Sequence, residues 1–98
     1  MASPDGSGGV SPAAIALRRL FGRNLREARR HAELSQHELH ERSGIAQSHL
    51  SELERALVDP KLSTMVDLAD VLGVDVLELL SPSPSFEGRR AARQRRGR

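Results

Sequence analysis

The 98-residue sequence contains no cysteine, tryptophan or tyrosine and only two phenylalanines. The lack of cysteine excludes disulfide frameworks, cysteine zinc sites and thiol nucleophiles. No apolar run is long enough to span a membrane, and the first residues lack the basic and apolar segments of a signal peptide. A chain this short buries only a small core, which must consist mostly of Leu, Val, Ile and Ala. We therefore predict one small, soluble, cytoplasmic domain.

Lysine is also nearly absent, because 14 of the 15 basic residues are arginine, and the formal net charge is only +2. This charge is distributed unevenly along the chain. Residues 15–32 carry +5, residues 33–86 carry −7, and residues 87–98 carry +5. The local field rather than the net charge governs encounters with charged partners. A basic end of the domain can therefore face phosphates while the acidic remainder faces solvent or a partner.

Two terminal segments have the composition of disordered chain. Residues 1–11 are rich in Gly, Ser and Pro, and such a segment buries too little apolar surface to offset the entropy of ordering. Residues 82–98 contain two prolines near their start and six arginines near their end. These arginines either attract nucleic-acid phosphates nonspecifically or form a solvated run. The folded domain is predicted at residues 12–81.

Capping signals and apolar spacing predict an all-α fold with five helices and no strand. The first helix begins at Ser11-Pro12, where a capping hydroxyl precedes a proline at the first helical position. Ser35 caps the second helix with Glu38 at the capping-box position, and Gly44 ends it. The inward stripe of the first helix consists of Phe21, Leu25, Ala28 and Ala32.

Three further helices are predicted downstream of Gly44. The third covers residues 47–55, and its inward stripe is Ala46, Leu50, Leu53 and Leu57. Ser63 caps the fourth, and Gly73 closes it. The inward residues of this fourth helix are Leu62, Met65, Leu68, Ala69 and Leu72. The fifth is a turn or two at residues 76–80.

The segment LSQHELHERSGIAQSHLSELER (34–55) contains two short helices joined by a glycine-containing turn, which is the helix-turn-helix arrangement. It resembles the helix-turn-helix of the phage-repressor-like (Cro/XRE) family. GRNLREARR before it resembles that family's first helix, and DPKLSTMVDLADVLGVDVLELL after it resembles the fourth and fifth. The resemblance implies a compact five-helix DNA-binding domain with its helix-turn-helix at residues 36–55.

The third helix carries the residues that we expect to read DNA bases. Gln47, Ser48, Ser51 and Glu52 lie away from the leucine stripe, and a polar helix face fits a major groove about 12 Å wide. Glutamine can pair with adenine through both amide atoms, and glutamate can accept from cytosine N4. The resemblance implies base contacts at Gln47, Ser48 and Glu52. A solvated polar helix face is the alternative.

We expect the phosphates of the DNA backbone to contact the protein at the ends of the second, third and fourth helices. Gln36 starts the second helix, where free N–H groups and the positive end of the dipole favour anions. The resemblance implies phosphate contacts for Gln36, Arg55 and Lys61, and Ser35 can add a hydroxyl. For Lys61, a solvated loop charge is equally compatible.

The resemblance also implies a salt bridge between Arg29 and Glu54. Both residues border the apolar stripes of their helices, which would bring them together where the first and third helices meet. A partly buried pair orients more reliably than it stabilises. We therefore predict a structural role, in which the pair fixes the recognition helix against the scaffold.

Three positions depart from the family pattern. His40 lies where the family prefers alanine, so we expect its ring to tilt outward or the two helices to separate slightly. Ala46 replaces a capping residue, at a cost of about 1 kcal/mol in helix stability. Ala56 replaces the glycine that usually ends the recognition helix, so this helix is expected to run on toward Val58.

The fifth helix bears on assembly. Leu77 and Leu80 are expected to close the core, which leaves Val76 and Leu79 as apolar surface for a dimer interface. Family members commonly dimerise through this region, which would place two recognition helices about one DNA turn apart. The alternative is that these residues only cover a thin core.

Neither catalysis nor metal binding is predicted. His37 and His40 share a helix face, but no cysteine and no histidine–carboxylate metal motif accompany them. The sequence also has no nucleophile elbow and no glycine-rich phosphate loop. We therefore expect no enzyme activity, no cofactor and no metal.

The predicted function is a sequence-specific DNA-binding regulator, which represses as a homodimer on a palindromic operator in double-stranded DNA. We expect it in the cytoplasm, associated with the nucleoid, and without membrane contact. Lacking a sensor domain, it would be controlled by concentration, proteolysis, a protein partner or self-assembly. The alternatives are an antitoxin that represses its own operon, and a protein-binding adaptor whose arginine tail contacts nucleic acid nonspecifically.

Overall fold

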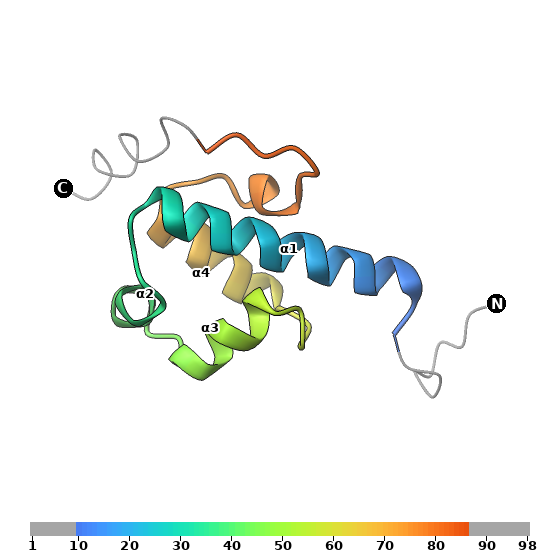
Figure 1. Cartoon of the computed structure of the whole chain (residues 1–98), viewed down its shortest axis with the longest axis horizontal. Helices are drawn as coiled ribbons and strands as arrows, with labels where there is room; N and C mark the ends of the chain where they lie inside the picture. Colours follow the sequence, from blue (N-terminus) through green and yellow to red (C-terminus); the bar gives the residue numbers. More distant parts are fainter. Residues whose placement is uncertain (1–9, 87–98) are drawn as a thin grey trace.

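The computed structural model describes residues 10–86, which fold into four α-helices and one 3-10 helix (Figure 1). These elements are α1 (Pro12–His31), α2 (Gln36–Ser43), α3 (Gln47–Glu54), α4 (Leu62–Leu72) and the 3-10 helix η1 (Val76–Leu80). No strand occurs between residues 10 and 86. The all-α helix-turn-helix fold is confirmed, whereas the count of five helices is slightly off, because four elements are α-helices and the last is a short 3-10 helix.

The long helix α1 is the scaffold of the domain (Figure 1). It packs against η1 and against α3, while α2 packs against α3 and α4. The predicted start of α1 is confirmed, since the Ser11 hydroxyl accepts a hydrogen bond from the Ala14 N–H at 3.2 Å and Pro12 occupies the first turn. Its predicted inward stripe is buried and joins the leucines of α3 and α4 in one core.

Helix α2 has the local chemistry that its sequence predicts. The Ser35 hydroxyl accepts from the Glu38 N–H at 3.0 Å, and the Glu38 carboxylate accepts from the Ser35 N–H at 2.8 Å. The Ser35 N–H bonded to this carboxylate, followed by the Ser35 hydroxyl beside it, holds the pKa of Glu38 below its ordinary value. Gly44 ends the helix in the left-handed conformation, with φ of 78°. Both ends of α2 are thus confirmed.

The end of α3 differs from the prediction. The helix stops at Glu54, and Ala56 takes the left-handed conformation with φ of 62°, so the expected continuation toward Val58 is wrong. Two hydrogen bonds explain this ending: the Ala56 N–H donates to the Leu53 carbonyl at 3.1 Å and the Leu57 N–H donates to the Glu52 carbonyl at 2.9 Å. This is a Schellman motif, which satisfies the last carbonyls without requiring glycine.

The loop between α3 and α4 corrects two further predictions. Leu57 and Leu62 were expected in the core but are 53% and 76% exposed. Helix α4 begins at Leu62, so the predicted cap at Ser63 is wrong, and its N-cap residue Lys61 makes no side-chain capping bond. The early ending of α3 takes Leu57 out of the helical register of that helix, whereas Leu62 is exposed as the first residue of α4.

The residues of η1 face the opposite way from the prediction. Leu79 is 0% exposed and Leu77 is 70% exposed, so the assignment of Leu77 to the core and Leu79 to a dimer interface is wrong. In a 3-10 helix the side chains at i and i+3 eclipse each other. Half-buried Val76 and buried Leu79 therefore share the face that packs on the core, and Leu77 points away from it.

The segment after η1 is also packed, so the predicted tail boundary at residue 82 is wrong. Phe86 is 5% exposed, and its ring centroid lies 6.0 Å from that of His31. Buried Asn24 donates through Nδ2 to the carbonyls of Leu79 at 3.1 Å and Ser81 at 2.8 Å. The remaining parts of the two predicted disordered segments, residues 1–9 and 87–98, lie outside the described residues.

Candidate nucleic-acid interface

Helix α3 presents a polar face to solvent. Gln47, Ser48 and Glu52 are exposed and Ser51 is half-buried, whereas Leu50 and Leu53 on the opposite side are buried at 0% and 1%. The structure thus places all four predicted base-reading residues away from the core. Such an arrangement leaves their polar atoms available to a groove of DNA.

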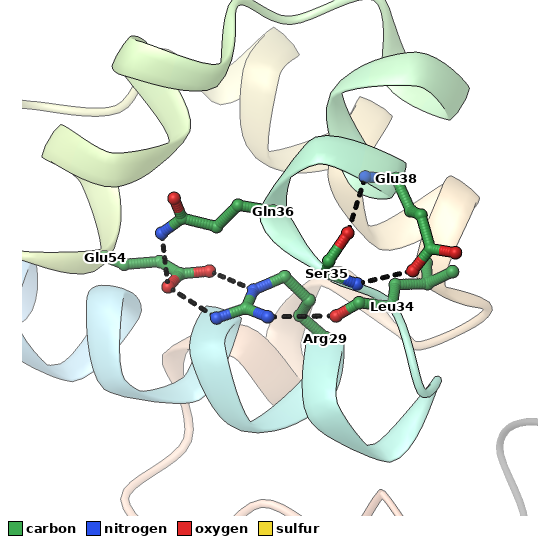
Figure 2. Close-up of polar contacts among 6 residues, drawn as sticks. All are labelled: Arg29, Leu34, Ser35, Gln36, Glu38 and Glu54. Atoms are coloured by element: carbon green, nitrogen blue, oxygen red, sulfur yellow. Dashed lines mark hydrogen bonds and ion pairs between the residues drawn. The ribbon is translucent and has the colours of Figure 1, made fainter.

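The C-terminal end of α3 is held by a buried ion pair (Figure 2). The Glu54 carboxylate accepts from Arg29 Nε at 2.7 Å and from Arg29 Nη2 at 3.0 Å. The two side chains are only 12% and 4% exposed for Arg29 and Glu54. Arg29 Nη1 also donates to the Leu34 carbonyl at 2.9 Å, so one guanidinium joins α1, the α1–α2 loop and α3.

Gln36 belongs to the same network, which sequence reasoning missed (Figure 2). Its Nε2 donates to Glu54 Oε1 at 3.1 Å, and the residue is half-buried. The first residue of α2 is thereby tied to the last residue of α3. A phosphate contact from Gln36 stays a prediction, and its second amide proton remains outside this hydrogen bond.

Gly22 is a second contributor that the sequence analysis missed. A Cβ at this position would lie 2.6 Å from the Leu53 carbonyl oxygen and 2.7 Å from that of Glu54. Helix α1 can therefore approach the C-terminal carbonyls of α3 only because residue 22 has no side chain. A glycine inside a long helix costs about 1 kcal/mol relative to alanine, and this cost was the available signal that the position has a packing role.

The N-terminal end of α3 is held more lightly. Ala46 makes no side-chain capping bond, as its residue type predicts. The His40 ring, half-buried at the α2–α3 turn, donates from Nδ1 to the Ile45 carbonyl at 2.8 Å and so stabilises the turn directly. The neighbouring His37 lies 3.3 Å from Gln47, measured between Nδ1 and Oε1.

The other predicted phosphate contacts flank α3. Arg55 is exposed at its C-cap, and Lys61 is exposed at the N-cap of α4. Arg18 of α1 forms an ion pair with Asp59, which lowers the pKa of Asp59 and ties the intervening loop to α1. Ser35 is exposed beside Gln36 but its hydroxyl is already engaged as the cap of α2. The phosphate roles of these residues stay predictions.

Residues 10–86 contain no group of three His, Cys, Asp or Glu side chains placed to hold a metal ion. None of the helices between these residues is both long and apolar enough to cross a bilayer.

The comparisons with known proteins match this geometry. Residues 25–79 match the family described as Helix-turn-helix, and the match spans more than half of the chain. The chain therefore belongs to the Cro/XRE-type helix-turn-helix family. This family consists of DNA-binding transcription regulators and is not a class of enzymes.

Two curated relatives come from Sinorhizobium fredii (strain NBRC 101917 / NGR234). The uncharacterized HTH-type transcriptional regulator y4dJ is 42% identical over 67 residues, which are 68% of this chain and 87% of that protein. The uncharacterized HTH-type transcriptional regulator y4dL is 43% identical over 53 residues, which are 54% of this chain but only 27% of that protein. No solved structure matches the chain significantly.

Proposed function

We propose that this protein is a sequence-specific DNA-binding transcriptional repressor that occupies a palindromic operator as a homodimer. The observation that carries the proposal is the polar outer face of α3 on a helix whose buried end is fixed by Arg29, Gln36 and Glu54. A rigidly held helix with exposed polar side chains is what major-groove reading requires.

Four polar residues on the outer face of α3 have a role in this proposal. Gln47 and Glu52 hydrogen bond to base edges, and Ser48 and Ser51 add adaptable hydroxyl contacts. Ser35, Gln36, Arg55 and Lys61 contact the phosphates on either side of the groove. Phosphate contacts set the register of the protein on the duplex but carry no sequence information directly.

The dimer needs a different residue from the one that the sequence suggested. Leu77 is 70% exposed on the side of η1 that points away from the core, and we assign it the interface role. A second apolar surface exists, a groove of about 310 Å³ whose lining includes Leu17, Pro60 and Leu62. Single substitutions can distinguish which of the two surfaces forms the dimer interface.

Selection of binding sites from random duplex DNA tests the proposed function. We expect a two-fold symmetric motif, because a homodimer presents two equivalent α3 helices. Recovery of no motif, or of binding that is indifferent to sequence, would contradict the repressor and favour the protein-binding adaptor.

Sedimentation of three variants tests the assembly. Leu77→Glu should give a folded monomer, because it places a charge at the proposed interface. Leu79→Glu should unfold the chain instead, because it buries an unpaired carboxylate. If Leu62→Glu gives a monomer while the sedimentation profile of Leu77→Glu stays that of a dimer, the interface lies at the groove and not at η1.

A further inference from the structure

The six arginines of α1 divide into two groups. Three side chains bond to groups outside the helix, and these are Arg18, Arg23 and Arg29. The other three are exposed and make no side-chain hydrogen bond or ion pair within residues 10–86, and these are Arg19, Arg26 and Arg30. We call these three the basic ridge. Their guanidinium groups are therefore the ones in α1 that are available to an external partner.

The basic ridge runs along one side of α1. Arg26 follows Arg19 by seven positions and precedes Arg30 by four, and these intervals are close to two turns and one turn of an α-helix with 3.6 residues per turn. Arg23 lies on the same side, and α1 contains only one acidic residue, Glu27. Like charges one turn apart destabilise a helix. The ridge thus costs stability in the free chain, and an anion bound along it would remove that cost.

The basic ridge lies beside the C-terminal end of α3. Helix α1 packs against α3 (Figure 1), and the two backbones approach closely at Gly22, where a Cβ would lie 2.6 Å from a carbonyl oxygen of α3. Arg26 follows Gly22 by one turn, and Arg29, one turn further on, bonds to Glu54. The exposed Arg55 follows Glu54 directly at the C-cap of α3. Arg55 and the ridge therefore flank the same junction of α1 and α3.

The chemistry of the basic ridge fits the backbone of duplex DNA. A guanidinium stays charged at physiological pH and pairs with phosphate through two N–H groups. A duplex carries one negative charge about every 1.7 Å of its axis, so a row of cations meets a row of anions. Binding of single strands also uses aromatic side chains on which bases stack. The chain has no Trp or Tyr, and Phe21 and Phe86 are buried, so α1 offers none of these rings for stacking.

We propose that the basic ridge binds the phosphates of the duplex DNA that flanks the site read by α3. This inference rests on the proposed function, because the placement of α3 in the major groove determines which DNA lies beside the ridge. The ridge adds affinity and register rather than specificity, since phosphate contacts carry no direct sequence information. Its attraction for a duplex does not depend on base reading, so random-sequence DNA tests it as well.

The salt dependence of binding counts the phosphate contacts. Each contact makes the logarithm of the affinity fall by about 0.9 for a tenfold increase in salt. Fluorescence anisotropy of the full chain on a random-sequence duplex measures this slope. Between 50 and 200 mM salt, we expect Arg26→Gln to shrink the loss of affinity roughly threefold, and Arg19→Gln, Arg26→Gln and Arg30→Gln together to shrink it roughly fortyfold. An unchanged slope in the triple variant overturns the inference.

Arg42→Gln is the matched control for charge. It removes the same charge from an exposed position in the last turn of α2, outside the ridge, so the native salt slope should remain. A slope reduced as much as in Arg26→Gln would show that net charge acts instead, which overturns the inference. Arg26→Lys keeps the charge and should keep the slope. Arg26→Gln should not lower the unfolding temperature, because glutamine is a good helix former; a lower temperature would show that contacts within the protein hold Arg26, and it overturns the inference too.

A third measurement locates the ridge on the DNA. The native chain has no cysteine, so Arg26→Cys carries the only thiol, to which an iron chelate that cleaves nearby DNA can be attached. On the site recovered by selection, we expect this variant to cleave the flanking duplex and Asp67→Cys, at an exposed position of α4, not to cleave it. Cleavage from neither position, or equally from both, overturns the inference. If no site can be selected, the proposed function fails, and the salt slope on the random-sequence duplex still decides whether the ridge binds DNA.

Discussion

The two ends of α3 are held in different ways. At the C-terminal end, Glu54 accepts three hydrogen bonds from Arg29 and Gln36, and its side chain is only 4% exposed. At the N-terminal end, Ala46 provides no cap, and the His37 side chain that meets Gln47 is 63% exposed. The buried end fixes the position of the helix, whereas the exposed end leaves the leading side chain adjustable.

This difference assigns separate tasks to the two ends. Hydrogen bonds in a buried site are strong because water does not compete for the partners, and a missing partner there is costly. Exposed contacts exchange with water at little cost. We therefore expect substitutions at the C-terminal end to change stability and docking, and substitutions at the N-terminal end to change chiefly what is read.

The largest expected effect is that of Glu54→Ala. It leaves the Arg29 guanidinium largely buried without its carboxylate, which should cost about 3 kcal/mol or more in the free energy of unfolding. Urea denaturation measures this loss. A cost below about 1 kcal/mol, in the range of an exposed ion pair, would show that the C-terminal end is not held by this network.

Gly22→Ala should have the second largest effect. The added methyl would meet the backbone of α3 at 2.6 Å, and backbone cannot rotate away as a side chain can. We expect a loss of about 1–3 kcal/mol and weaker DNA binding, because α3 must shift on its scaffold. Ala16→Gly is the opposite exchange at an exposed position of α1, so it should change stability through helix propensity while leaving DNA affinity unaltered.

Ala46→Ser tests the N-terminal end and should have a smaller effect of opposite sign. A serine hydroxyl can accept from the free N–H groups of the first turn, for a gain of about 1 kcal/mol. Thermal unfolding measures the gain. The control is Ala56→Gly at the other end, which relieves a left-handed alanine and should add about 1 kcal/mol as well. A loss of stability in Ala46→Ser would contradict the uncapped start of α3.

The smallest expected effect is the acid response of the α2 cap. Because the folded state lowers the pKa of Glu38, its contribution is fully present above the unfolded-state pKa and is lost as pH falls through the folded-state pKa. Glu38→Gln keeps an acceptor at the capping-box position but cannot titrate. The free energy of unfolding of this variant should therefore fall less at acidic pH than that of the native chain. If the two free energies change in parallel with pH, the cap is not coupled to protonation of Glu38.

The predictability of each element depended on how local its cause was. Ser11 and Ser35 each cap a helix through residues three positions away, so their roles could be predicted from the sequence. Leu57 continued the helical spacing of α3, but the Schellman ending after Glu54 broke that register. Spacing alone does not reveal where a helix stops when alanine takes the place of glycine.

In the candidate site, too, the features with local causes could be predicted from the sequence and the contacts between distant residues could not. The outward placement of Gln47, Ser48 and Glu52 follows from their spacing relative to Leu50 and Leu53, and the sequence was sufficient to predict it. The contact of Gln36 with Glu54 joins residues 18 positions apart, and that of Asn24 with the Ser81 carbonyl joins residues 57 apart. No local pattern contains such pairs, because each depends on how separate helices dock.

The sequence by itself determined an all-α helix-turn-helix chain, the capped start of α1, both ends of α2, and a polar face on α3, since each is set by neighbours within a few positions. Only the tertiary structure decided the inverted faces of η1, the packing of Phe86, the close approach at Gly22 and the network around Glu54. Those features arise from contacts between distant segments, where burial and shape outweigh local preference. The contact between His37 and Gln47 belongs with them, because it forms only once the turn brings α2 and α3 together.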